Sequence, residues 1–190
     1  MDIYKVLKKQ KKSYKRFVLF MGFIFILLPA VLIYSKMLSA FFIAYLIILE
    51  ILIFQLILIR YNEEHLHFKQ VNKKIVIEVG VLRRKYTIST DKVAIIHIMK
   101  SVKSFEILII TKSRFRNKRL KHVDFRFLDK QKTINKYYNR VKLENDGPYF
   151  YFVIRKGGVK KYLLLDFLYK TCVGAAFTDE AIEKIKEYRS

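Results

Sequence analysis

The stretch FVLFMGFIFILLPAVLIYSKMLSAFFIAYLIILEILIFQLILI, residues 17–59, decides the architecture of this 190-residue chain. It holds two apolar runs, residues 17–34 and 38–59, with three residues between them. Neither run contains Lys, Arg or Asp, and Glu50 is their one acid. An apolar run of about 18 residues or more predicts a helix that crosses a membrane. We therefore predict a two-helix transmembrane hairpin over residues 17–61, which leaves the rest of the chain for one soluble domain.

The distribution of charge predicts how the hairpin is oriented. Residues 1–16 carry seven Lys or Arg against one Asp, and residues 62–190 carry 29 basic against 14 acidic residues. The turn between the two runs holds one charge, Lys36. Because positive residues near the ends of a span stay on the cytoplasmic side, we predict a two-span protein of the cell membrane with both termini in the cytoplasm. A cleaved signal peptide is the alternative, but the first run is long for one and a second run follows at once.

Two polar residues of the second run, Glu50 and Gln55, are candidate intramembrane contacts. A charge at the depth of Glu50 is costly, so this side chain should be protonated, face protein or contact water. The first run offers no basic partner for it. Contact with another membrane protein or within a homo-oligomer, a proton or ion path, and a neutral acid bonded inside the hairpin are the alternatives. Assembly or a neutral acid is favoured, because two spans with so little polar lining cannot form a transport path alone.

The soluble part has the pattern of a domain rich in β-structure. Residues 62–74 are polar and predict a linker. We predict strands at residues 75–81, 85–90, 93–99, 105–111, 120–128, 149–155 and 160–166, the last two joined by a glycine turn at 156–159. Apolar residues spaced as on one helix face predict a helix within 129–141, and Thr178 followed by two acids predicts the start of a C-terminal helix. The fold class is therefore α+β, with a small β-barrel or sandwich of about seven strands and a C-terminal helix over residues 75–190.

Two segments of this domain resemble a known arrangement. IVIEVGV at residues 75–81 resembles an opening strand that ends in Gly, and TISTDKV at residues 87–93 resembles the polar turn and strand that follow it. The order of hairpin and domain is similar to that of bacterial membrane proteins with a two-span hairpin followed by a pleckstrin-homology-like domain. The resemblance covers residues 75–190, and the helix near residues 130–141 is an insertion that it does not predict. It implies binding or scaffolding at a membrane, and it implies no catalytic residues.

Basic residues gather in three places of the domain. The first is a loop of six cations with Phe115 among them: Lys112, Arg114, Arg116, Lys118, Arg119 and Lys121. The second flanks the predicted glycine turn, with Arg155, Lys156, Lys160 and Lys161, and the third is residues 83–85. Each cation near an anionic membrane surface contributes about 1 kcal/mol to the free energy of binding to that surface. We therefore expect contact with anionic lipid headgroups or with an acidic partner protein. A solvated loop is the alternative, and nucleic acid is the least favoured partner.

Signatures of other functions are missing from the sequence. It contains no glycine-rich phosphate loop, nucleophile elbow or His-Glu-x-x-His motif, so we expect no enzyme. His65 and His67 follow two acids, but spacing sets no third ligand, and we expect neither a metal nor a cofactor. The single Cys172 allows no internal disulfide, as expected of a cytoplasmic domain. We expect a non-enzymatic membrane-anchored adaptor or accessory protein, or alternatively a small integral subunit of a larger transport or secretion complex assembled through the hairpin.

Overall fold

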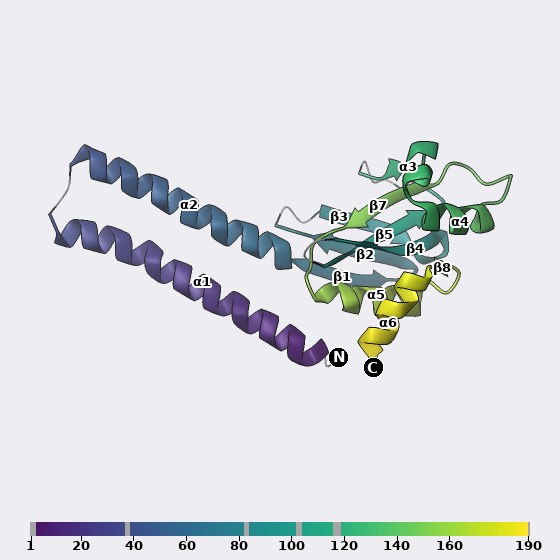
Figure 1. Cartoon of the computed structure of the whole chain (residues 1–190), viewed down its shortest axis with the longest axis horizontal. Helices are drawn as coiled ribbons and strands as arrows, with labels where there is room; N and C mark the ends of the chain where they lie inside the picture. Colours follow the sequence, from purple (N-terminus) through teal and green to yellow (C-terminus); the bar gives the residue numbers. More distant parts are fainter. Residues whose placement is uncertain (1–2, 37–38, 82–83, 102–103, 116–118, 190) are drawn as a thin grey trace.

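The computed structural model describes residues 3–36, 39–81, 84–101, 104–115 and 119–189, and it consists of a helical hairpin attached to one end of an α+β domain (Figure 1). Helix α1 (Ile3–Tyr34) and helix α2 (Ala40–Glu64) are each long and apolar enough to cross a membrane. Their most apolar stretches are not buried inside the protein, which leaves a large apolar surface suited to lipid. Because α1 begins at Ile3, the basic N-terminal segment belongs to the same helix as the first apolar run.

The domain contains two sheets. Strands β1 (Leu66–Val71), β2 (Lys74–Val79) and β3 (Arg84–Ser89) form an antiparallel meander, and His65 alone separates α2 from β1. The short 3₁₀ helix η1 (Thr90–Lys92) leads to the second sheet, whose strand order is β6-β7-β5-β4-β8. Its strands are β4 (Val93–Lys100), β5 (Phe105–Thr111), β6 (Lys121–His122), β7 (Phe150–Ile154) and β8 (Ala176–Phe177). The last of these, β8, runs parallel to β4.

Four shorter helices cover the two faces of the second sheet. On one face, α3 (Phe125–Lys130) and α4 (Lys132–Val141) pack against it and bury a small core around Leu108 and Ile134. On the other face, α5 (Lys160–Thr171), α6 (Asp179–Arg189) and the first sheet enclose the main core, which includes Ile77, Ile88, Ile96, Ile107, Ile109, Leu164 and Leu168. Figure 1 shows α3 and α4 on one side of the sheets and α5 and α6 on the other.

Much of the predicted secondary structure is confirmed. The predicted strands at residues 75–81, 85–90, 93–99, 105–111 and 149–155 correspond to β2, β3, β4, β5 and β7. Helix α4 turns Ile134 and Tyr138 into the protein, as its apolar spacing predicts. Helix α6 begins directly after Thr178, with two acids in its first turn and Lys186 and Arg189 in its last. The α+β class is therefore correct, but the eight strands form two sheets and do not close into a barrel.

The predicted linker at residues 62–74 is wrong. Helix α2 continues to Glu64, and residues 66–71 form strand β1. Leu66 is buried in the main core, and the pair Asn72–Lys73 makes the tight turn to β2. Asn72 takes a φ of 54°, a left-handed conformation that Asn tolerates better than most residues. The domain is therefore joined to the hairpin without a flexible spacer.

The predicted strand at residues 160–166 is also wrong, because these residues open helix α5. Leu164, Leu165, Leu168 and Cys172 are all buried and recur at helical spacing. Leucine is a strong helix former, and this segment has no β-branched residue before Thr171. The glycine pair at 157–158 consequently leads from a strand into a helix and does not turn a β-hairpin.

The predicted strand at residues 120–128 is short in the structure. Pairing with β7 is limited to Lys121 and His122, and helix α3 starts at Phe125. The carboxylate of Asp124 accepts a hydrogen bond from the backbone N–H of Phe127 at 2.9 Å, which caps this helix. Local capping therefore outweighs the alternating pattern that predicted a longer strand.

Candidate functional site

A groove rich in cations lies where strand β3 of the first sheet meets strand β7 of the second. It is a cavity of about 760 Å³, and the five cations that line it are Arg84, Arg119, Lys121, Arg155 and Lys156. They come from three segments far apart in sequence: the start of β3, residues 119–121 at the start of β6, and the residues after β7. We call this site the basic groove.

Strand pairing explains why these segments converge. Arg84 stands opposite Val79 at the end of the β2–β3 pair. Lys121 pairs with Tyr151 of β7, and Arg155 directly follows the last residue of that strand. The two sheets meet where the ring of Tyr86 in β3 stacks on a ring of β7. The fold therefore places the three segments around one opening.

Two stacked aromatic pairs line the basic groove, one on each face of β7. Tyr86 stacks on Phe152 with ring centroids 4.4 Å apart, and Phe127 stacks on Tyr151 at 4.1 Å. Rings beside guanidinium and ammonium groups favour ligands that combine negative charge with flat or apolar surface. The described lining includes no Ser, Cys, His, Asp or Glu, and its polar side chains are those of Lys, Arg and Tyr.

The positive charges of the groove are crowded. Arg155 donates from Nε to Oε2 of Glu106 at 3.2 Å, an ion pair at the rim. Burial and the neighbouring Arg84 guanidinium lower the pKa of Lys156, although Glu63 acts in the opposite direction. A lowered lysine pKa means that the protonated amine is disfavoured by its surroundings. An anion in the groove would relieve this repulsion.

The groove opens near the point where the hairpin joins the domain. The backbone N–H of Val81 donates to Oδ1 of Asn62 at 3.0 Å, and Lys156 and Asn62 are both close neighbours of Gly80. Asn62 lies within one helical turn of Ile59, the last residue of the second apolar run. One end of the groove therefore lies close to the level at which the apolar helices end.

The structure divides the predicted basic loop. Arg119 and Lys121 line the groove, whereas Lys112 follows the far end of β5 and its Nζ lies 4.0 Å from Oδ2 of Asp146. Arg114 is exposed, outside the described lining of the groove. Arg116 and Lys118 fall outside the described residues.

The second predicted cluster is divided as well. Arg155 and Lys156 line the groove, and Lys160 lies at the start of α5 near the base of α1. Lys161 is only 1% exposed, and its amine donates to Oγ of Ser104 and to the carbonyl oxygens of Phe105 and Arg155. Lys161 is therefore an internal structural residue and cannot reach a surface ligand.

The aromatic members of the groove were not predicted. Tyr86, Phe127 and Tyr151 gave no functional signal, because an aromatic residue in an alternating strand is usually core. Tyr86 and Tyr151 belong to strands whose edges border a cluster of cations, and that juxtaposition exists only in the folded chain. Arg84, from the third predicted cluster, also lines the groove only because the folded chain brings the end of the β2–β3 pair next to β7.

The polar residues of the hairpin have different surroundings. Glu50 is half-buried, whereas Gln55 is exposed on the surface of α2.

Among the described residues, no group of three or more His, Cys, Asp or Glu is arranged to hold a metal ion. His65 and His67 take part in ring contacts.

Comparison of the chain with known proteins adds no functional assignment. No family model, curated protein or solved structure matches it. The resemblance to pleckstrin-homology-like membrane proteins therefore stays a prediction.

Proposed function

We propose that this protein is a non-enzymatic, membrane-anchored adaptor whose basic groove binds an acidic segment of a partner protein at the inner membrane face. The observation that carries this proposal is the convergence of five cations on one groove that is also lined by aromatic rings. The two apolar helices supply the anchor, and the excess of basic residues on both sides of the hairpin supports the cytoplasmic orientation.

The shape of the groove supports a peptide as its ligand. It is a cavity of about 760 Å³ where β3 and β7 meet, whereas a lipid headgroup layer is flat. Strand β3 is at the edge of its sheet, with β2 as its neighbour within the described residues. An extended segment can add to such an edge by main-chain hydrogen bonds while its acidic side chains meet the cations.

The proposal can be tested with the full-length protein in nanodiscs of neutral phosphatidylcholine. The probe is a fluorescent peptide rich in Asp and Glu, and a peptide with Asn and Gln in their place measures the contribution of charge. In R84Q/R155Q, affinity for the acidic peptide should fall by at least about tenfold, because two charge contacts with the peptide are lost. The double variant K132Q/K136Q, which removes two exposed α4 cations, should change it by less than about twofold.

Three results would contradict the proposal. Equal peptide affinity for the groove variant and the α4 variant would remove the groove from the interaction. Binding of an oligonucleotide more tightly than the acidic peptide would indicate a nucleic-acid site. Loss of peptide binding whenever the nanodisc contains phosphatidylglycerol would indicate that lipid headgroups occupy the groove.

A second function is favoured by one observation in the hairpin. The amide of Gln55 is exposed on α2, among apolar neighbours, and such a group gains hydrogen bonds if another membrane helix covers it. We propose, as the alternative, a small integral subunit of a transport or secretion complex assembled through Gln55 and Glu50. Mass measurement of the native assembly in detergent tests it: E50L/Q55L should dissociate the complex, and an unchanged mass would contradict assembly through these residues.

A further inference from the structure

A second cavity lies where the hairpin meets the domain. It measures about 640 Å³ and is bounded by the basic end of α1, the end of α2, the first residues of β1 and the first turn of α5. We call it the hairpin-base pocket. It is separate from the basic groove, since the described linings of the two cavities share no residue.

The pocket lies at the level expected for lipid headgroups. Tyr14 of α1 and Tyr61 of α2 both line it, with ring centroids 6.5 Å apart. Each lies within about one helical turn of an apolar run, which ends at Ile59 in α2 and begins at Phe17 in α1. Tyrosine is enriched at this depth because its ring is apolar and its hydroxyl is polar.

The walls of the pocket combine apolar surface with rings. Leu7, Phe68 and Leu163 supply aliphatic and aromatic surface. Tyr61, His65 and His67 continue the row of rings from Tyr14, with successive centroids 5.3 Å and 4.7 Å apart. This lining suits the glycerol region and the first methylene groups of an acyl chain.

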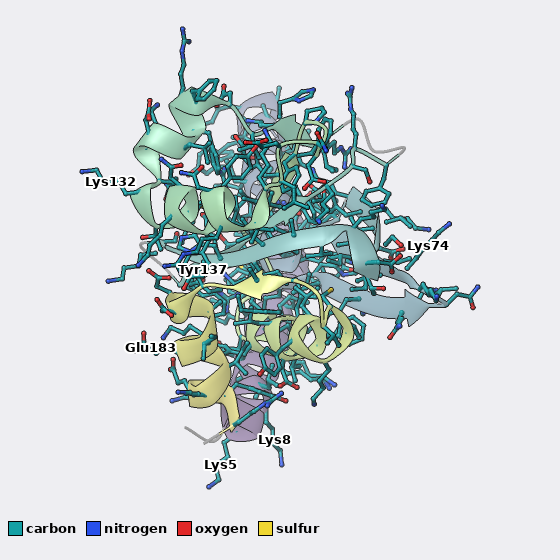
Figure 2. The ribbon with its side chains drawn as sticks, turned by 90° about the vertical axis from the view of Figure 1, so that its right-hand side faces the viewer. Lys5, Lys8, Lys74, Lys132, Tyr137 and Glu183 are labelled. Atoms are coloured by element: carbon teal, nitrogen blue, oxygen red, sulfur yellow. The ribbon has the colours of Figure 1, made fainter. Side chains whose placement is uncertain are left out.

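Three cations stand around this apolar lining. Lys8 and Lys11 lie one turn apart on α1, on the face that also carries Leu7 and Tyr14, and Lys160 belongs to α5. The one acid of the described lining, Glu64, forms an ion pair with Arg60 at 3.1 Å and also interacts electrostatically with Lys160, so four cations face a single carboxylate. The charge left at the rim is therefore positive. Figure 2 shows Lys8 on the side of the molecule that also holds α6 and far from Lys132 of α4.

We propose that the hairpin-base pocket binds one anionic phospholipid of the surrounding membrane, with its phosphate held by Lys8, Lys11 and Lys160. The glycerol and the start of its acyl chains contact Leu163 and the rings of Tyr14 and Tyr61. This lipid sits against the contacts that join hairpin and domain, where Gln10 Oε1 accepts a hydrogen bond from the backbone N–H of Val159 at 3.1 Å.

Native mass spectrometry of the full-length protein tests the proposal. The detergent-solubilised protein is incubated with phosphatidylglycerol or with phosphatidylcholine, and retained lipid is counted per chain. We expect one retained phosphatidylglycerol and a clear preference over phosphatidylcholine. K8Q/K11Q/K160Q should lower the affinity for phosphatidylglycerol roughly a hundredfold, because each lysine contributes about fivefold. The matched control K130Q/K132Q/K136Q removes three exposed cations around α4 and should leave retention within about twofold.

A second variant separates the pocket from surface charge. Leu163→Trp adds bulk to the half-buried wall without changing charge, and it should abolish retention while the midpoint of urea unfolding stays close to that of the unaltered protein. Equal retention of both lipids, or equal loss in the two triple variants, would overturn the proposal. So would loss of retention in R84Q/R155Q with the pocket variants unaffected, because the lipid would then occupy the basic groove. The acidic-peptide measurement addresses the groove separately, so either proposal can fail alone.

Discussion

At the residue scale, Lys161 joins three segments of the chain from inside the domain. Its amine donates to Oγ of Ser104 at 2.5 Å, to the carbonyl oxygen of Phe105 and to the carbonyl oxygen of Arg155 at 3.2 Å. Burial lowers the pKa of this lysine, and Glu106 partly opposes the effect. Hydrogen bonds to the amine offset the cost of keeping it away from water, and they hold the start of β5 against the end of β7.

Replacing Lys161 by Met should therefore lower the free energy of unfolding by about 3 kcal/mol. The substitution removes the amine that donates to the carbonyl oxygens of Phe105 and Arg155 and to the hydroxyl of Ser104. Urea titration of the full-length protein, followed by the tyrosine near-UV circular dichroism, measures the change. Lys186→Met removes an exposed lysine of α6 and is the control, with an expected change below about 0.5 kcal/mol. Equal stability of the two variants would mean that Lys161 does not hold the segments together.

His97 makes the stability of the domain depend on pH. It is 5% exposed, and its Nδ1 lies 3.0 Å from Oγ1 of Thr178 and 3.7 Å from Oε2 of Glu180. Burial lowers the pKa of His97, although Glu180 partly raises it, and Tyr137 of α4 contacts Asp179 next to this site. The folded protein therefore favours the neutral ring.

The sign of the effect follows from this lowered pKa. The unfolded chain binds a proton to this histidine near its ordinary pKa of about 6.5, whereas the folded chain does so only at lower pH. Stability should therefore be fully present above about pH 6.5 and decrease as the pH falls toward the folded pKa. Urea midpoints between pH 5 and 7.5 measure this, and His97→Gln should flatten the profile. His122→Gln, at an exposed ring, should keep the wild-type slope, and a steep profile in His97→Gln would contradict the assignment.

At the element scale, the segment between β7 and α5 connects the domain to both helices of the hairpin. The backbone N–H of Gly157 donates to the carbonyl oxygen of Glu63 at 2.7 Å, and Val159 donates to Gln10. Gly157 has a φ of +115°, and a Cβ there would lie 2.5 Å from Cδ2 of Leu66. Glycine is needed at this position for backbone conformation and for space.

Substitution of Gly157 by Ala should loosen this junction. We expect a loss of about 2 kcal/mol, because the new residue is strained at a positive φ and collides with Leu66. The midpoint of thermal unfolding and the rate of proteolytic cleavage near residues 155–160 report the change. Gly174→Ala is the control, since nothing lies within 4 Å of its added methyl group. Equal cleavage rates in the two variants would show that the close approach at Gly157 is unimportant.

At the scale of the whole molecule, the hairpin and the domain form a continuous structure. The chain passes from α2 to β1 through His65, and the two ends of the described chain lie near each other at the side of the domain away from α3 and α4 (Figure 1). Any orientation of the hairpin in a membrane therefore also decides on which side the basic groove and the hairpin-base pocket are presented.

Cysteines introduced one at a time and labelled with a maleimide should show on which side of the membrane each position lies. In cells, Ser35→Cys at the hairpin turn should react with a membrane-impermeant maleimide, and Lys132→Cys in α4 should react only after permeabilisation. The native Cys172 does not interfere, because burial raises the pKa of its thiol to about 11 and keeps it unreactive. Labelling of Lys132→Cys in intact cells would reverse the predicted topology.

The sequence alone determined the hairpin, the basic character of the domain and its α+β class. These properties follow from long apolar runs, from charge counts and from local periodicity, each of which acts over neighbouring residues. Only the tertiary structure decided that Arg84, Arg119 and Arg155 share one groove, that Lys161 is internal and that the hairpin base encloses a pocket. Convergence of this kind depends on strand pairing and packing between residues far apart in the chain, for which a single sequence carries no local signal.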